Sequence, residues 1–595
     1  MLDIDNMVLN GDVVGLISRR SKYIKTLSGR ENMVSKKIAI LGGSSTQELR
    51  SFLHLFLLNR GINPEFYESE FGKFFEESVF SSEMLDAFKP DVIYIFICEH
   101  NLIYHPWVTD GVQEVEGRLA EDTERIWDML SSLRSRFPGA EIIVNNLPFP
   151  QTRVCGNLDG TYFAGFTNYV KNFNLELERL IQDFSNVYLH DLWYLSAKMG
   201  LDRYHDSDQW VLYRFAQSQA ATAYIAHNLA AVIAGLYGRS KKVVVVDLDN
   251  TLWSGIIGDE GVEGVEVGGE TPAGEPYADF QRYLGQLHDR GVVLTVCSKN
   301  DPDLALEGLN ADKNVLHEDY FAVIKANWEP KDRNLAATAA ELSLGEDSFV
   351  FVDDNPAERA LVAQSRPCIS IVGCNQVTDM LLALDKLAYF EPVRLTADDF
   401  KRNEMYKGNL LRKQAEAQYA DYGSYLKSLK TVLYVGKIEA PQLPRCAQLI
   451  SKTNQFNLTA LRISEAQLRS CCSDGRHIAF YARARDRFGE NGIISVLLAS
   501  VQGSTAEIEI FLMSCRVLKR DIEFAIMNKF TACCKEMGLA EVKASYRRTE
   551  RNAMVSTLYQ DLGFIPTKQE GDTQFYTLKL TDYKDFPLSL EFEGQ

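Results

Sequence analysis

Two carboxylates separated by one residue follow an apolar run in the middle of the chain. Asp247 and Asp249 come directly after four valines at 243–246, and Leu248 lies between them. Alternation along an extended chain places both carboxylates on the same side of the exit from this run. Such a pair can hold Mg2+, which prefers oxygen ligands, while one carboxylate attacks phosphorus and the other transfers a proton. The spacing therefore indicates phosphoryl-transfer chemistry.

Further polar side chains follow other apolar runs of the same region. In chain order they are Ser298 and Asn300 after the run at 292–297, Lys331, and Asp353 with Asp354 close by after the run at 349–352. The hydroxyl and the amide can bind a phosphate, and the lysine supplies a cation for the transferred phosphoryl group. Ligands of parallel sheets lie at the carboxyl ends of the strands. A single acidic pair is often only a solvated turn, but four ordered elements predict one phosphate site.

This arrangement resembles the haloacid dehalogenase superfamily of aspartate-nucleophile phosphatases. The resemblance implies that Asp247 is the nucleophile, Asp249 the general acid/base, and Ser298 and Lys331 phosphate ligands. It also implies a Mg2+ ion held by the carboxylate of Asp247, the backbone carbonyl of Asp249, and Asp353. The short spacings leave little room for a cap domain, so we expect a capless, open site. Such a site suits a macromolecular substrate or closure by a neighbouring domain.

Several longer segments resemble the FkbH-like branch of that superfamily. They are DLDNTLWSGIIGDEG, CSKND, NWEPKDRNL, FVFVDDNPAER, KTNQFNLT, DRFGENG and FLMSCRVLKRDIE, and the resemblance extends over residues 241–590. Characterised members are glyceryl transferase/phosphatases that dephosphorylate 1,3-bisphosphoglycerate and load the glyceryl group as a thioester onto an acyl carrier protein. The resemblance thus implies a Mg2+-dependent enzyme for a small phosphorylated three-carbon substrate. Its partner would be the phosphopantetheine arm of the carrier protein.

Two other functions are compatible with the same residues. One is an aspartate-nucleophile phosphatase that acts on a phosphorylated sugar or polyol in surface-polysaccharide biosynthesis. The other is a pathway scaffold with degenerate flanking domains. The presence of Asp247, Asp249, Ser298, Lys331 and Asp353 argues against a wholly inert scaffold. Carrier-protein genes beside this one would favour the glyceryl transferase, and glycan-assembly genes would favour the phosphatase.

The last part of the chain resembles an acetyltransferase-type fold. Residues 552–564 approximate the NxxAxxLYxxxGF ending of such domains, with Val555 where alanine is usual. Working acyltransferases bind a pyrophosphate through the backbone of a glycine-rich turn. Here Lys519 and Asp521 occupy the positions where glycine is expected, and Arg520 lies between them. The substitution disfavours acetyl-CoA, so we expect either a phosphopantetheine arm or no ligand at this turn.

Two cysteines lie beside the predicted sites. Cys297 ends an apolar run and is expected to be a buried thiol with a raised pKa. Cys515 lies where a strand gives way to a helix, beside Arg516. A helix N-terminus and a guanidinium both favour thiolate, the form that accepts an acyl group. Cys515 is therefore the possible acyl-thioester site, the alternative being a structural cysteine at a strand end.

The first part of the chain resembles an SGNH-type hydrolase. Ser44, in the segment GGSST, lies where that family has GDSxT, and Asp202 with His205 fits its DxxH motif. A serine activated by a histidine that an acid orients is a sufficient nucleophile. However, Gly43 replaces the usual aspartate, and the segment that ends at Asn101 only approximates the oxyanion-hole motif. The resemblance leaves two alternatives, a hydrolase triad or a docking role.

Strands that alternate with helices predict an α/β chain of three domains, since 595 residues exceed what one hydrophobic core can hold. The expected parts are a leading arm (1–35), an SGNH-hydrolase-like α/β domain (36–240), a capless haloacid dehalogenase-like Rossmann-like α/β domain (241–395), a helical linker (396–430) and an acetyltransferase-like α+β domain (431–595).

Composition and charge exclude several classes of protein. The chain is 46% hydrophobic and 24% charged, which excludes a disordered or fibrous protein. Its net charge of -18 makes nucleic acid an unfavourable partner. The 11 scattered cysteines favour reduced thiols in a cytoplasm. The first residues are acidic where a signal peptide would be basic, so a cytoplasmic location is expected. The uncharged stretch at 215–238 contains polar groups costly to place in lipid, so it is interpreted as a buried helix, and no membrane span is expected.

Overall fold

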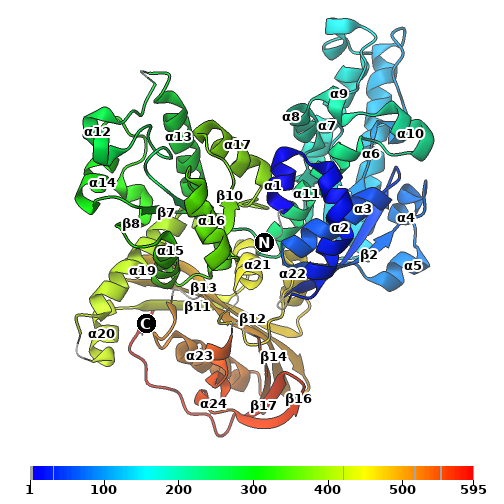
Figure 1. Cartoon of the computed structure of the whole chain (residues 1–595). Coiled ribbons are helices and arrows are strands. Elements are labelled where there is room, and N and C mark those ends of the chain that lie inside the picture. Colours follow the sequence, from blue (N-terminus) through cyan, green and yellow to red (C-terminus); the bar gives the residue numbers. More distant parts are fainter. Residues whose placement is uncertain are drawn as a thin grey trace. The chain divides into compact units, whose positions relative to one another are not determined.

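The computed structural model describes residues 4–30, 33–269, 271–419, 421–453, 455–514, 517–549 and 552–593. The chain forms two compact units. The first, called the N-terminal unit below, consists of Leu2–Arg239 and Ile463–Ser470. The second, called the main unit, consists of Ser240–Arg462 and Cys471–Gln595. Figure 1 shows the elements of both, with the N-terminal unit in blue and cyan.

A five-stranded parallel sheet with the order β2-β1-β3-β4-β5 forms the N-terminal unit. Its strands are β1 (Val34–Gly42), β2 (Ile62–Glu68), β3 (Val92–Phe96), β4 (Glu141–Asn145) and β5 (Val187–His190). Every residue of β3 and β4 is buried, as expected for central strands of a parallel sheet that is covered on both faces.

The helices of this unit are α1 (Ile4–Asn10), α2 (Val13–Ser28), α3 (Gln47–Asn59), α4 (Phe74–Val79), α5 (Glu83–Phe88), α6 (Val112–Arg136), α7 (Phe166–Ile181), α8 (Leu192–Met199), α9 (Leu201–Tyr204), α10 (Ser207–Tyr213) and α11 (Gln219–Leu236). The uncharged stretch forms α11, of whose 18 residues 12 are buried, and α11 packs against α3. None of the described helices combines the length and the hydropathy that a bilayer span requires.

The first residues of the chain differ from the leading arm that the sequence predicts. They form α1 and α2, and α2 packs against α3. Leu16, Tyr23 and Leu27 of α2 are buried. These three side chains recur at helical spacing, which gives α2 an apolar face that the unit covers.

A second parallel sheet, with the order β10-β9-β6-β7-β8, forms the first half of the main unit. Its strands are β6 (Val243–Val246), β7 (Val293–Ser298), β8 (Phe321–Ala326), β9 (Phe349–Val352) and β10 (Ser370–Val372). Its helices are α12 (Ile257–Gly264), α13 (Glu275–Asp289), α14 (Pro302–Leu309), α15 (Lys331–Leu342), α16 (Pro356–Ser365) and α17 (Val377–Leu387).

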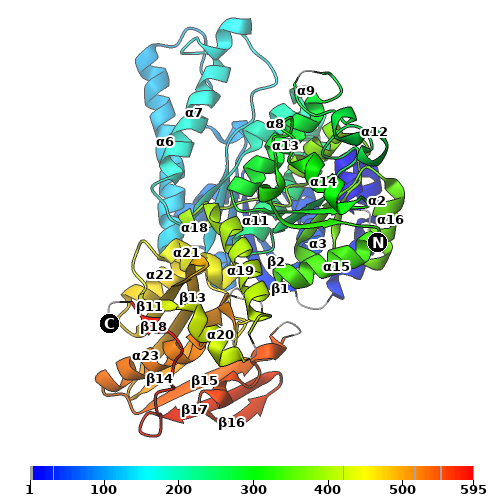
Figure 2. The ribbon, with the colours of Figure 1, turned by 90° about the vertical axis from the view of Figure 1, so that its left-hand side faces the viewer.

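The segment expected to be a linker contains α18 (Ala397–Phe400), α19 (Arg402–Glu416) and α20 (Tyr422–Leu429). Helix α19 packs on the sheet instead of only connecting it to the next domain. Its Tyr406 lies buried in the same core as Val245 and Phe351 of the sheet and Leu335 of α15. Because an apolar face of α19 covers this core, the helix is part of the fold of the sheet. Figure 2 shows α18, α19 and α20 in succession.

An eight-stranded mixed sheet, with the order β16-β17-β15-β14-β13-β12-β11-β18, forms the rest of the main unit. Its elements are β11 (Val432–Lys437), α21 (Leu443–Lys452), β12 (His477–Asp486), β13 (Gly489–Gln502), β14 (Thr505–Met513), α23 (Ile522–Glu536), β15 (Glu541–Arg547), α24 (Leu558–Asp561), β16 (Ile565–Glu570), β17 (Thr573–Lys579) and β18 (Glu591–Phe592). Helix α22 (Glu465–Ser473) follows α21 in the chain, and its residues up to Ser470 belong to the N-terminal unit. The three sheets confirm the predicted multidomain α/β class.

Candidate active site

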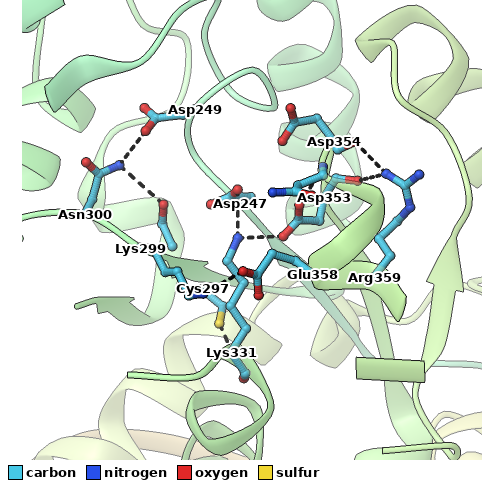
Figure 3. A network of polar contacts seen from close by, with 12 residues as sticks. Asp247, Asp249, Cys297, Lys299, Asn300, Lys331, Asp353, Asp354, Glu358 and Arg359 are labelled. Atoms are coloured by element: carbon cyan, nitrogen blue, oxygen red, sulfur yellow. Dashed lines mark hydrogen bonds and ion pairs between the residues drawn. The ribbon is translucent and has the colours of Figure 1, made fainter. Parts of the chain in front are cut away.

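The site lies at one edge of the parallel sheet of the main unit. Asp247 follows β6, Ser298 ends β7 and Asp353 follows β9. Strand β6 lies between β9 and β7 and is parallel to both, so the three carboxyl ends are neighbours. Figure 3 shows Asp247 and Asp353 side by side above Lys331.

Lys331, the first residue of α15, bridges two carboxylates. Its Nζ is 2.8 Å from Asp247 Oδ2 and 2.6 Å from Asp353 Oδ2. The side chains of Lys331 and Asp353 are 3% and 0% exposed. Burial by itself would lower the pKa of Lys331, but the charges of Asp247 and Asp353 raise it above its usual value. The ammonium therefore stays charged at neutral pH and holds the two carboxylates together.

One oxygen of Asp247 remains for a ligand. Its Oδ1 is buried and has no hydrogen-bond partner among the described residues. One carboxylate oxygen each of Asp247, Asp353 and Asp354 lies within 4.8 Å of the other two. Burial and the charge of Asp247 raise the pKa of both Asp353 and Asp354. A buried carboxylate oxygen without a donor is costly, and a cation with oxygen ligands would remove that cost.

Asp249 accepts hydrogen bonds with both of its oxygens. Oδ1 accepts from the indole Nε1 of Trp253 at 2.8 Å and from the backbone N–H of Ile257 at 3.1 Å. Oδ2 accepts from Asn300 Nδ2 at 3.0 Å. Burial raises the pKa of Asp249, while these donors act in the opposite direction. The donors fix the carboxyl group, and the raised pKa suits a group that must both give and take a proton.

Ser298 and Asn300, the two predicted phosphate ligands at the end of β7, have different hydrogen-bond partners from each other. Ser298 is buried, and its backbone carbonyl accepts from the N–H of Asn327. Asn300 donates through Nδ2 to Asp249 and, at 3.4 Å, to the Ser298 hydroxyl. Asn300 therefore also orients the carboxyl group of Asp249, a contact that sequence reasoning missed.

Arg359 and an ion pair across the site were also missed. Arg359 donates from Nη1 to the backbone carbonyls of Asp353 at 2.6 Å and of Asp354 at 2.7 Å, which fixes the acidic segment after β9. Lys299 lies 2.6 Å from Glu358 (Figure 3). The segment FVFVDDNPAER contained the only signal, because Glu358 and Arg359 lie five and six residues beyond Asp353, in the first turns of α16.

The predictions for Cys297 and Cys515 have different outcomes. Burial raises the pKa of Cys297 to about 12, which confirms the predicted inert strand thiol. Its Sγ lies 3.7 Å from the backbone carbonyl of Lys331. Cys515, the predicted acyl-thioester site, lies outside the described residues, as does Arg516. At the turn that follows, Lys519 and Asp521 have φ of 61° and 60°, the left-handed conformation for which glycine is expected.

The N-terminal unit does not assemble the predicted triad. Ser44 Oγ is buried and makes no hydrogen bond within the described part of the chain. His205 Nε2 lies 2.9 Å from the carbonyl oxygen of Phe149, and a carbonyl only accepts, so this nitrogen carries the hydrogen. Within the described residues, Asp202 and His205 are not joined by a hydrogen bond. The interpretation as a working triad is therefore wrong for this conformation, because His205 uses Nε2 to bind the backbone.

The replacement of aspartate by Gly43 has a steric reason. A Cβ at this position would lie 2.1 Å from Asn101 Oδ1. Asn101 donates through Nδ2 to the carbonyl oxygen of Gly43 at 2.9 Å and accepts from the N–H of Cys98 at 2.8 Å. The amide that would donate to an oxyanion is thus bound to the backbone of this chain.

We expect a fluorophosphonate probe to leave Ser44 unlabelled. The serine lacks a hydrogen bond to a base, so its hydroxyl should remain a weak nucleophile. Intact mass and peptide mapping after incubation with the probe measure this result, with a known serine hydrolase as the positive control. Stoichiometric labelling of Ser44 that is lost in His205→Ala would contradict this expectation.

Comparison with known proteins finds a family model that matches part of the chain. Residues 37–234 match the family model described as FkbH, N-terminal domain. The N-terminal part of BF1531 from Bacteroides fragilis, described as containing a phosphatase domain complexed with Mg, is 28% identical with a TM-score of 0.58. The match covers 63% of this chain and 99% of that chain. The chain is therefore similar to the FkbH family over the matched residues.

Two acetyltransferases also match the FkbH-like chain, each over 25% of its length. The ribosomal-protein-S18-alanine N-acetyltransferase from Escherichia coli is 14% identical, with 94% of that chain covered and a TM-score of 0.21. The spermidine N-acetyltransferase from Vibrio cholerae is 13% identical, with 97% covered and a TM-score of 0.21. No curated protein matches the FkbH-like chain.

Proposed function

We propose that this chain is a Mg2+-dependent phosphatase and glyceryl transferase that uses Asp247 as its nucleophile. The observation that carries the proposal is the buried pair of carboxylates bridged by Lys331, in which Asp247 keeps one oxygen without a donor. The BF1531 fragment, whose description includes a phosphatase domain and Mg, supports the same chemistry. The substrate would be 1,3-bisphosphoglycerate and the acceptor an acyl carrier protein.

The donor set fits Mg2+. The carboxylates of Asp247 and Asp353 and the backbone carbonyl of Asp249 would hold the ion, with Asp354 beside it. All of these donors are oxygen, which Mg2+ prefers. When bound, the ion supplies positive charge to the oxygens of the transferred phosphoryl group.

The residues of the chain divide the remaining work. A carboxylate oxygen of Asp247 attacks phosphorus, the bond from phosphorus to the leaving oxygen breaks, and Asp249 gives that oxygen a proton. Asp249 then takes a proton from the water that hydrolyses the aspartyl phosphate. Lys331 offsets negative charge on the phosphoryl group, and Ser298 binds one of its oxygens.

Glyceryl transfer requires a thiol in addition to this site. In the proposed step, a thiolate attacks the carbonyl carbon of the acyl phosphate, and inorganic phosphate leaves. Cys515 remains the predicted residue for this thioester, before the group passes to the phosphopantetheine thiol of the carrier. Asp247 and Asp249 would then hydrolyse the remaining phosphate ester, which leaves the free hydroxyl on the glyceryl group and releases the second phosphate as inorganic phosphate.

Intact-protein mass spectrometry tests the whole proposal. The purified chain is incubated with 1,3-bisphosphoglycerate, Mg2+ and a panel of acyl carrier proteins in their phosphopantetheine form. We expect a carrier with the added mass of a glyceryl group and release of phosphate. Phosphate release without any carrier adduct would support a plain phosphatase for a sugar or polyol phosphate instead. A Cys515→Ser variant that loads the carrier at the normal rate would place the thioester elsewhere.

We expect EDTA to abolish phosphate release and Mg2+ to restore it. The acidic cluster of Asp247, Asp353 and Asp354 contains carboxylates only, so zinc should not replace Mg2+. Phosphate release is measured with an aryl phosphate, before and after dialysis against EDTA and with each metal added back. Full activity in chelator would contradict the metal assignment.

A further inference from the structure

A buried ion-pair cluster joins the mixed sheet of the main unit to α19. Asp486, the last residue of β12, accepts from Arg412 Nε and Nη2 of α19, both at 2.8 Å. Arg520 Nη1 donates to the same carboxylate at 2.9 Å. The side chains of Arg412 and Asp486 are 3% and 0% exposed. A two-point contact of this kind fixes the orientation of both partners and not only their distance.

The residue that follows Arg412 binds the helix that carries Lys331. Lys413 Nζ donates to the backbone carbonyls of Ala340 at 3.0 Å and Glu341 at 2.6 Å, and to Ser343 Oγ at 2.9 Å. The two carbonyls lie in the last turn of α15, where backbone carbonyls lack the usual partner four residues further along the helix, and Ser343 is the C-cap of this helix. A cation at this end also interacts favourably with the helix dipole.

Polar contacts therefore fix both ends of helix α15. At its first position, Lys331 binds Asp247 and Asp353, and at its last turn the carbonyls bind Lys413. Between them, Leu335 and Leu342 of α15 share one core with Tyr406 of α19. A shift of α19 would thus move α15, because packed helices shift together and not independently.

The turn at 519–521, where the sequence resemblance places a pyrophosphate loop, is also used for contacts within the chain. The carbonyl of Lys519 accepts from the Tyr422 hydroxyl of α20 at 2.5 Å. Asp521 Oδ2 accepts from the backbone N–H of Ser589 at 3.2 Å. With Arg520 bound to Asp486, the three residues of the turn each hold another segment of the main unit.

From these contacts we propose that Arg412, Lys413 and Asp486 are positioning residues for Lys331. They hold α19 between the mixed sheet and α15, and α15 in turn places the Lys331 ammonium between Asp247 and Asp353. The mixed sheet thus stabilises the position of Lys331 through α19 and α15, independently of any ligand that the last domain binds. The inference on catalysis rests on the proposed function, whereas the mechanical link does not.

Two variants of the full chain test the link, with a third as the matched control. Lys413→Met removes the contact with the end of α15 from an exposed position, so we expect it to fold. Asp486→Asn weakens the buried cluster. Lys407→Met removes a lysine of the same helix that donates to the carbonyl of Asp319 and not to α15. Circular dichroism and size-exclusion chromatography establish that each variant is folded.

The first readout needs no activity. Hydrogen–deuterium exchange of the amides of α15 should become faster in Lys413→Met and Asp486→Asn, by about 2- to 30-fold, and stay unchanged in Lys407→Met. Unchanged exchange of α15 in a folded Lys413→Met variant, or equal acceleration in Lys407→Met, would overturn the proposal. If Asp486→Asn fails to fold, Lys413→Met still decides the question.

The second readout separates positioning from general stability. With an aryl phosphate and Mg2+, kcat should fall by about 10-fold in Asp486→Asn and less in Lys413→Met, while KM stays within about twofold. Lys413→Arg, which keeps the cation, should recover the wild-type kcat. A change in KM alone would overturn the positioning role. A wild-type chain that releases no phosphate would refute the proposed function and leave the exchange result to decide the link.

Discussion

Replacement of Asp247 by asparagine should abolish phosphoryl transfer, with kcat reduced by about 10⁴-fold or more. The amide keeps the shape of the carboxylate and can still accept from Lys331, but it cannot attack phosphorus. Phosphate release from an aryl phosphate in saturating Mg2+ measures the loss. A near-normal rate in Asp247→Asn would contradict Asp247 as the nucleophile.

Two further variants make this result specific. Asp301→Asn is the matched control, because Asp301 is exposed, follows Asn300 and, within the described part of the chain, accepts from the backbone N–H groups of Asp303 and Leu304. Its activity should stay within about twofold, since an exposed helix cap that binds only backbone N–H groups makes no contact with the reacting groups. Asp249→Asn should slow turnover strongly yet let an aspartyl phosphate accumulate from an acyl phosphate, whose leaving group needs no proton.

Replacement of Lys331 by methionine should reduce both activity and stability. Removal of the cation leaves Asp247 and Asp353 facing each other in a buried site, and the loss of one partner of such a cluster costs about 3–5 kcal/mol. The missing charge should also lower kcat by about 10²- to 10³-fold, as for other groups that stabilise a developing oxyanion. Urea unfolding and phosphate release measure the two effects.

The control for this variant is Lys325→Met. Lys325 lies six residues before Lys331 and forms an ion pair with Glu341, but both side chains are partly exposed, at 24% and 40%. Such pairs contribute about 0–1 kcal/mol, so this variant should keep nearly full stability. Equal destabilisation by the two variants would show that the burial of Lys331 is not what makes its ion pairs important.

Local patterns in the sequence determined the strands of the site and the positions of the carboxylates that follow them. The valines at 243–246 and the run at 349–352 are continuous and apolar, and each forms a strand whose residues are all buried. A buried parallel strand needs apolar side chains on both faces, so the pattern can be recognised without tertiary information. Asp247 and Asp353 follow these runs directly, and their position at strand ends could therefore be predicted.

Order along the sheet was not contained in those patterns. Strand β6 pairs with both β7 and β9, although β8 comes between them in the chain. The order of the strands depends on which faces of the sheet the helices cover. Because β6 lies between β7 and β9, Asp247 is the neighbour of both Ser298 and Asp353. Arg359 likewise acts through backbone carbonyls, which leave no trace in the sequence.

The N-terminal unit and α19 show the same division between local pattern and tertiary contact. The motifs around Ser44 and His205 indicate a hydrolase-like fold, but the bond from His205 to the carbonyl of Phe149 depends on a loop 56 residues away. The charged sequence of α19 suggests a solvated linker, yet Tyr406 lies in a core and Arg412 binds Asp486. Residue type and spacing define a helix or a strand end because these depend on neighbours in the chain. Which buried donor meets which acceptor depends on packing between distant segments, and only the tertiary structure decided it.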